Sequence, residues 1–113
     1  MPKVLVVEDF DPYFKMIDRE LSGKVEVLRA ATLEEGDNLF QSNPDIDLII
    51  MDACVPGHKP NAMPLVKKIV GTGFTKPIIA CSTTWTGELL KAGATHESDK
   101  DRVAKITLEL LNL

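Results

Sequence analysis

Polar side chains that could do chemistry follow four candidate strands of the sequence. Glu8 and Asp9 follow the run at residues 3–7, and Asp52 follows the run "DLIIM" at residues 47–51. If such runs are parallel strands, their carboxyl ends meet at one edge of a sheet, and the side chains that follow them share a crevice. Ser82, Thr83 and Thr84 follow the run at residues 76–81, and Ser98, Asp99 and Lys100 follow a weaker strand candidate at residues 92–97.

The residue types in this predicted crevice suit metal and phosphate chemistry. The carboxylates of Glu8, Asp9 and Asp52 would repel one another and raise at least one pKa unless a cation lay between them. Mg²⁺ prefers oxygen ligands and is commonly held by one or two carboxylates together with water and phosphate. Lys100 and a hydroxyl such as that of Ser82 could bind phosphoryl oxygens. Asp52 could then act as a nucleophile that forms an aspartyl phosphate.

The elements that must position these residues alternate between strands and helices. Capping signals bound two of the helices: Asp11-Pro12 begins one that Ser22-Gly23 ends, and Thr32 with Glu35 forms a capping box for another that Asn43-Pro44 ends. Helical spacing of Leu65, Val66, Ile69 and Val70 predicts a third helix, and two more are expected around residues 88–91 and over 99–111. Strands are predicted at residues 3–7, 24–30, 47–51, 76–81 and 92–97.

Five strands that alternate with five helices predict an α/β fold. Right-handed crossovers would produce a parallel sheet covered by helices on both faces. The strand at 24–30 alternates in polarity and is therefore expected near a sheet edge. At 113 residues, the chain is expected to be a single domain over residues 1–113.

Composition excludes several classes of function. The net charge of −4 provides no electrostatic attraction to nucleic acid. The apolar runs are too short for a membrane span or a signal peptide. Two separated cysteines without a CxxC motif favour a reducing compartment, so a cytoplasmic location is expected.

Four segments together resemble the receiver domain of two-component response regulators. "VLVVEDFDP" resembles the first-strand acidic pair, with Glu8 and Asp9, and "DLIIMDACVPG" resembles the phosphoacceptor segment, with Asp52. "KPIIACS" places Ser82 at the hydroxyl position, and "AGATHESDK" places Lys100 at the phosphate-binding lysine. The resemblance covers essentially the whole chain and implies a flavodoxin-like (βα)5 three-layer sandwich with strand order 2-1-3-4-5.

The resemblance also implies roles for these residues. Asp9, Asp52 and the backbone carbonyl of Cys54 would bind Mg²⁺, and Glu8 would contribute directly or through water. Asp52 would accept the phosphoryl group, Lys100 would pair with it, and Ser82 would move to form a hydrogen bond with it.

Partners are implied in the same way. The donor would be a sensor histidine kinase or a histidine phosphotransfer protein, and the output would be contact with an effector protein. Neither nucleic acid nor a membrane would be a direct partner, and the chain would be a monomer or a weak homodimer. At most, it would catalyse its own slow phosphorylation and dephosphorylation.

The sequence departs from the receiver pattern in the region through which receivers usually signal. Asp101 stands where the family has a proline after the lysine, and Glu97 replaces the aromatic switch residue. The segment after Ser82 is about one helical turn short, so the fourth helix is expected to be truncated. These departures favour an alternative function: a pseudo-receiver that binds proteins without being phosphorylated.

Other interpretations are weaker. A nucleotide- or flavin-binding domain would need glycines at the first strand-to-helix turn, which here reads Glu8-Asp9-Phe10-Asp11. An aspartyl-phosphate phosphatase would need a second acid at position 54, which is Cys54. Asp52 alone could be a simple turn residue. Cys54 and Cys81 are expected to be apolar fillers, and His58 and His96 to be loop or surface residues.

Overall fold

The computed structural model describes residues 1–56 and 59–113, and five strands alternate with five helices along this part of the chain. The strands are β1 (Lys3–Val7), β2 (Glu26–Ala30), β3 (Leu48–Met51), β4 (Ile78–Cys81) and β5 (His96–Ser98). The helices are α1 (Asp11–Leu21), α2 (Leu33–Ser42), α3 (Met63–Gly71), α4 (Thr86–Ala92) and α5 (Val103–Leu110).

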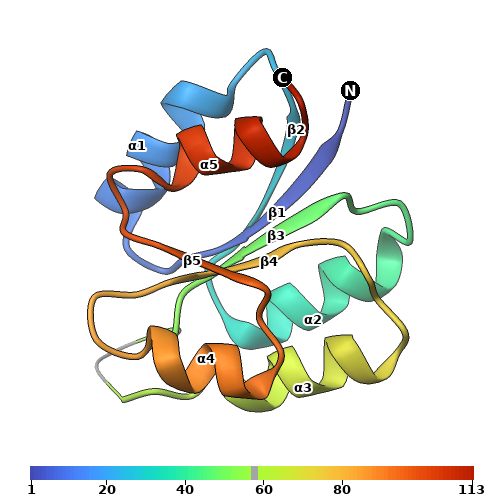
Figure 1. Cartoon of the computed structure of the whole chain (residues 1–113), viewed down its shortest axis with the longest axis vertical. Coiled ribbons are helices and arrows are strands. Elements are labelled where there is room, and N and C mark those ends of the chain that lie inside the picture. Colours follow the sequence, from blue (N-terminus) through green and yellow to red (C-terminus); the bar gives the residue numbers. More distant parts are fainter. Residues whose placement is uncertain (57–58) are drawn as a thin grey trace.

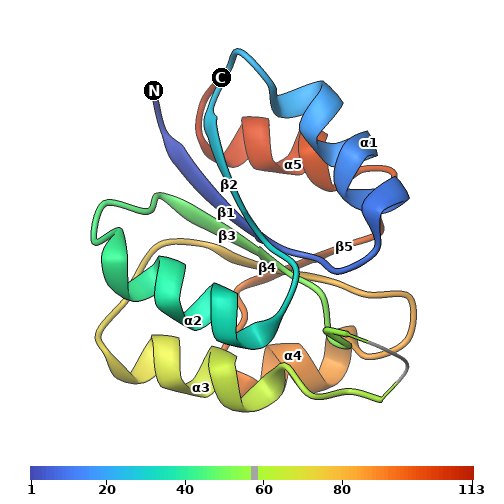
Figure 2. The same ribbon diagram turned by 180° about the vertical axis from the view of Figure 1, so that it is seen from behind.

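The strands form a parallel sheet in the order β2-β1-β3-β4-β5, which confirms the predicted fold class. Helices α1 and α5 cover one face of this sheet, and α2, α3 and α4 cover the other (Figure 1). The view from behind shows the same three layers, with both termini toward the top of the view (Figure 2). As predicted, β2 lies at a sheet edge.

The sheet separates two hydrophobic cores because successive side chains of a strand point to opposite faces. In β1, Val4 and Val6 belong to the core under α1 and α5, whereas Leu5 and Val7 belong to the core under α2, α3 and α4. All four side chains are fully buried. Burial on both faces explains why the central strands are continuous apolar runs and why the polar residues begin where each strand ends.

The largest difference from the predicted elements lies near the C-terminus. The fifth strand was expected at residues 92–97 but is formed by His96–Ser98, because Ala92 still belongs to α4. Gly93 then ends that helix with a φ of 127°, a conformation that favours glycine. The last helix begins at Val103 rather than at residue 99. Helix α4 has only seven residues, in agreement with the predicted truncation.

Two local predictions about helices were wrong, and one was confirmed. Asp11 was expected to cap α1, but Phe10 occupies the N-cap position without a side-chain hydrogen bond, and Asp11 is the first helical residue. Val70 was expected on the same side of its helix as Leu65, Val66 and Ile69, which are buried, but Val70 is 40% exposed. The predicted cap of α2 is present: the Oγ1 of Thr32 accepts a hydrogen bond from the amide of Glu35 at 3.1 Å. The carboxylate of Glu35 accepts one from the amide of Ala31 at 3.0 Å, in place of the amide of Thr32 that a full capping box would use.

Candidate functional site

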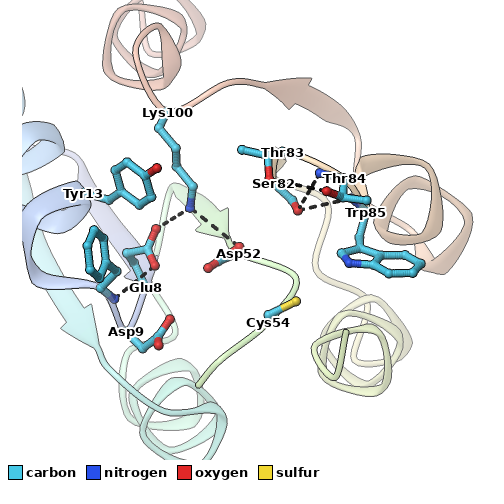
Figure 3. A pocket seen from close by; sticks show the side chains of 11 residues that line it. Glu8, Asp9, Tyr13, Asp52, Cys54, Ser82, Thr83, Thr84, Trp85 and Lys100 are labelled. Carbon is cyan, nitrogen blue, oxygen red and sulfur yellow. Dashed lines mark hydrogen bonds and ion pairs between the residues drawn. The ribbon is translucent and has the colours of Figure 1, made fainter. Parts of the chain in front are cut away.

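Three carboxylates meet at the carboxyl edge of the sheet. Glu8 and Asp9 follow β1, and Asp52 follows the neighbouring strand β3, in which Met51 is paired with Val7. One carboxylate oxygen from each of the three residues lies within 4.8 Å of the other two (Figure 3). The sheet register therefore brings together acidic residues that are more than 40 positions apart in the sequence.

Glu8 is the buried member of this group, with 1% of its surface exposed. Its Oε1 atom accepts a hydrogen bond from the ammonium group of Lys100, and its Oε2 atom accepts one from the amide of Phe10 at 3.2 Å. Burial raises the pKa of Glu8 to about 7, although Lys100 acts in the opposite direction. The carboxylate of Asp52 also contributes to this rise. A cation in this cluster would therefore be favoured electrostatically.

Lys100 lies close to two of the three carboxylates, those of Glu8 and Asp52. Its side chain is 9% exposed, and its Nζ atom lies 3.6 Å from the Oδ1 atom of Asp52 in addition to its contact with Glu8 (Figure 3). The ring of Tyr13 lies 5.2 Å from the same Nζ atom, which is within the range of a cation–π contact. The ammonium group is thus held at a defined position beside Asp52.

Asp52 is oriented by the backbone around it. Its amide donates to the carbonyl of Val7 at 3.1 Å, which continues the ladder between β1 and β3. Its Oδ1 atom accepts a hydrogen bond from the amide of Ala53 at 2.8 Å. The side chain is 16% exposed, so the carboxylate is fixed in direction and still accessible from solvent.

Ser82 lies on the opposite wall of the crevice and has a local structural role. Its Oγ atom accepts hydrogen bonds from the amides of Thr84 at 3.4 Å and Trp85 at 3.2 Å, just before α4 begins (Figure 3). A hydroxyl has one proton to donate as well as two lone pairs. Both bonds to Ser82 use its lone pairs, so the proton is still available to a ligand.

The crevice around these groups has a volume of about 540 Å³. Its lining includes three aromatic side chains whose place sequence reasoning did not predict: Phe10, Tyr13 and Trp85. Phe10 and Tyr13 could have been suspected, because they lie next to the acidic pair and one helical turn beyond it. The other lining residues are Glu8, Asp9, Asp52, Cys54, Ser82, Thr83, Thr84 and Lys100.

The other residues that the sequence singled out are the cysteines, the histidines and the two departures from the receiver pattern. Cys54 lines the crevice and Cys81 is fully buried, and both are free thiols. The Nδ1 atom of His96 lies 2.8 Å from the Oγ1 atom of Thr95, and His96 does not belong to the acidic cluster. His58 lies outside the described residues. Glu97 and Asp101, which replace the aromatic and the proline of the receiver pattern, are both exposed.

The donor set is suitable for Mg²⁺. Carboxylate oxygens are the ligands this ion prefers, and it keeps several water molecules, so an accessible site fits it better than a closed one. Asp9 and Asp52 are both partly exposed. Glu8 is already bonded to Lys100, which leaves Asp9 and Asp52 as the carboxylates most open to a metal ion.

Structural comparison identifies the fold. The receiver domain of Francisella response regulator 1452 is 22% identical, with 99% of this chain and 98% of that chain covered at a TM-score of 0.80. A response regulator receiver domain protein from Clostridium thermocellum is 24% identical, with coverage of 99% and 92% and a TM-score of 0.82. A two-component response regulator from Clostridium difficile is 19% identical, with coverage of 99% and 97% and a TM-score of 0.81.

The chain therefore has the fold of response regulator receiver domains, as the sequence motifs indicated. No protein-family model matches the sequence, and comparison with curated proteins gives no match. Within residues 1–56 and 59–113, no helix has the length and apolarity needed to cross a membrane.

Proposed function

We propose that this chain is a receiver domain that accepts a phosphoryl group on Asp52 in the presence of Mg²⁺. The observation that carries the proposal is the position of Lys100, whose ammonium group contacts Glu8 and lies 3.6 Å from Asp52 inside an acidic cluster. A buried lysine beside an accessible aspartate can hold the oxygens of a phosphoryl group in place while the aspartate reacts.

Each of the site residues would have its own role in the phosphoryl transfer. A carboxylate oxygen of Asp52 forms the new bond to phosphorus, and the donor's leaving group departs from the opposite side. Asp9, Asp52 and the carbonyl of Cys54 hold Mg²⁺, which, when bound, neutralises charge on the phosphoryl oxygens. Glu8 keeps Lys100 in position and adds to the negative potential that attracts the metal.

Lys100 and Ser82 would stabilise the product. The ammonium group of Lys100 lies near enough to Asp52 to pair with a phosphoryl group attached there. The hydroxyl of Ser82 lines the same crevice and has a proton to donate. To reach the phosphoryl group, Ser82 would exchange its bonds to the amides before α4 for a bond to the ligand, which couples the start of α4 to the state of Asp52.

The donor and the receiving partner are those that the likeness to receiver domains implies. A phosphohistidine on a sensor kinase or a phosphotransfer protein is the expected donor, and the output is contact with an effector protein. The two free cysteines accord with a cytoplasmic location. Residues 1–113 would act as one receiver unit.

A pseudo-receiver is the second candidate function. It is favoured by the exposed Glu97 and Asp101, which stand where the receiver pattern has an aromatic switch and a proline. It is also favoured by the contact of Lys100 with Glu8, which already partly satisfies the charge of the lysine. In this alternative the same fold would bind a partner constitutively, and Asp52 would not be modified.

Intact mass after incubation with acetyl phosphate separates the two functions. The wild-type chain with Mg²⁺ should gain one phosphoryl group, and Asp52→Asn should gain none. Removal of Mg²⁺ with EDTA should also abolish the adduct. The pseudo-receiver becomes the correct description if two results are obtained together. The wild type gains no mass, and beryllofluoride with Mg²⁺ leaves the NMR spectrum of its backbone amides unchanged.

A further inference from the structure

Arg29 connects strand β2 to the loop that carries the acidic pair. Its Nη2 atom forms an ion pair with the Oδ1 atom of Asp11 at 2.6 Å. The same guanidinium donates to the carbonyl of Glu8 from Nε at 3.4 Å and from Nη2 at 3.3 Å, and to the carbonyl of Asp9 at 3.4 Å. The contacts to the carbonyls are long and individually weak, but all of them converge on residues 8–11.

The fold places this arginine where it can reach the loop. Arg29 is paired with Val6 in the sheet register, and the next residue, Ala30, accepts a hydrogen bond from the amide of Glu8 at 2.9 Å. The guanidinium carbon lies 4.5 Å from the ring centroid of Phe14 in α1, which adds a cation–π contact. The Arg29 side chain is 28% exposed, so packing limits the positions of its charged end.

We propose that Arg29 is a positioning residue for the acidic site, because it fixes the backbone of Glu8 and Asp9 and so sets the direction of their carboxylates before a metal ion binds. The proposal rests on the Mg²⁺ site of the proposed function. A planar guanidinium can bond to two carbonyls and a carboxylate at the same time, which the single ammonium group of a lysine cannot do with the same geometry.

The direction in which a variant of Arg29 changes the affinity for Mg²⁺ distinguishes a positioning role from a simple effect of the positive charge. Arg29 is a cation near a metal site, so if only its charge mattered, Arg29→Gln would make Mg²⁺ bind more tightly. If Arg29 positions the ligands, the same variant makes Mg²⁺ bind more weakly, by about tenfold if it behaves like other groups that orient metal ligands. Arg29→Lys keeps the positive charge but loses the planar guanidinium group. Its affinity for Mg²⁺ should lie between those of the wild type and Arg29→Gln.

Two measurements on the folded protein test the proposal. Isothermal titration calorimetry gives the Kd for Mg²⁺, and amide hydrogen exchange without metal reports on Phe10, whose amide donates to the Oε2 atom of Glu8. In Arg29→Gln the Phe10 amide should exchange faster while amides of the central strands keep their protection. Arg19→Gln is the matched control, because Arg19 carries the same charge and is exposed in the last turn of α1. It should leave both measurements unchanged.

The outcomes are distinguishable from a failure of the proposed function. If Arg29→Gln binds Mg²⁺ more tightly than the wild type, or if Phe10 exchanges at the wild-type rate, the positioning role is overturned. If the wild type binds no Mg²⁺, the metal site of the proposed function fails. The exchange rate of Phe10 then still decides whether Arg29 orders this loop.

Discussion

The ammonium group of Lys100 donates a hydrogen bond to the carboxylate of Glu8, which lies 92 positions earlier in the chain. Both side chains are buried, with 9% and 2% of their surfaces exposed. This contact ties the loop before α5 to the end of β1, and it places the lysine beside Asp52. The same pair therefore contributes to the stability of the fold and to the geometry of the candidate site.

Removal of Lys100 alone should destabilise the protein. Lys100→Met leaves the carboxylate of Glu8 buried without its cationic partner, and breaking a buried pair in this way typically costs about 3 kcal/mol or more. Urea unfolding without Mg²⁺ at pH 8 measures the change. The double variant Glu8→Met/Lys100→Met removes both charges and should recover most of the loss. A double variant as unstable as Lys100→Met would show that packing, and not the unpaired charge, causes the effect.

The stability lost in Lys100→Met should depend on pH. Burial raises the pKa of Glu8 to about 7, and Lys100 lowers it, so the pKa of Glu8 should rise further when the lysine is absent. A raised carboxyl pKa means that the folded state holds the proton more tightly than the unfolded state does, so stability falls as pH rises through the folded pKa. Unfolding at pH 5 and pH 8 should therefore show the smaller loss at pH 5. An equal loss at both values would contradict this account.

Asp9 should contribute to Mg²⁺ binding, whereas an acid on the first helix should not. Asp9→Asn removes one of the two carboxylates most open to the metal, and we expect the Kd to rise by at least about tenfold. Asp18→Asn makes the same change of charge in α1, at a residue that does not line the crevice. Isothermal titration calorimetry with MgCl₂ compares the two. Similar affinities in both variants would rule out Asp9 as a ligand.

The two thiols should react at very different rates. Burial raises the pKa of Cys81 to about 12, and its side chain is fully buried. The pKa of Cys54 is also raised, by burial and then by the carboxylates of Asp52 and Asp9, but this residue lines the open crevice. With iodoacetamide at pH 8, Cys54 should be modified at least about tenfold faster than Cys81.

Peptide mass analysis of the alkylated protein assigns each product. Asp52→Asn should speed the modification of Cys54, because a nearby negative charge is removed. Faster modification of Cys81 than of Cys54 would contradict the burial of Cys81.

Gly93 should be intolerant of any side chain. It ends α4 with a φ of 127°, and a Cβ atom there would lie 2.8 Å from the Cγ2 atom of Val70 in α3. Gly93→Ala should cost about 1–3 kcal/mol in unfolding free energy. Gly73→Ala is the matched control: its φ is also positive, at 91°, but no atom lies within 4 Å of the added Cβ.

Thermal unfolding measures both glycine variants, and Gly93→Ala should have the lower Tm. Val70→Ala combined with Gly93→Ala should recover part of the difference, because the clashing methyl groups are removed. If Gly73→Ala is as costly as Gly93→Ala, backbone strain alone explains the effect and the contact with Val70 contributes nothing.

Several features of this protein were predictable from the sequence, because they depend on neighbours along the chain. The apolar runs identified the positions of β1, β3 and β4, since strands buried on both faces must be apolar throughout. The fifth strand is short and polar, and it was predicted several residues too early. The N-cap hydrogen bond between Thr32 and the amide of Glu35 is local and was predicted correctly. The positions of Glu8, Asp9, Asp52 and Lys100 after strands also placed them at one edge of the sheet, since parallel strands end together.

Tertiary structure decided what depends on residues distant in the sequence. Asp11 is a good capping residue by type, yet it pairs with Arg29 of a neighbouring strand while Phe10 takes the N-cap position. The contact between Lys100 and Glu8 spans nearly the whole chain, and the burial that raises the pKa of Glu8 comes from packing around it. Sequence spacing sets which end of a strand a side chain occupies, but distances of a few ångströms between such side chains are set by sheet register and loop packing.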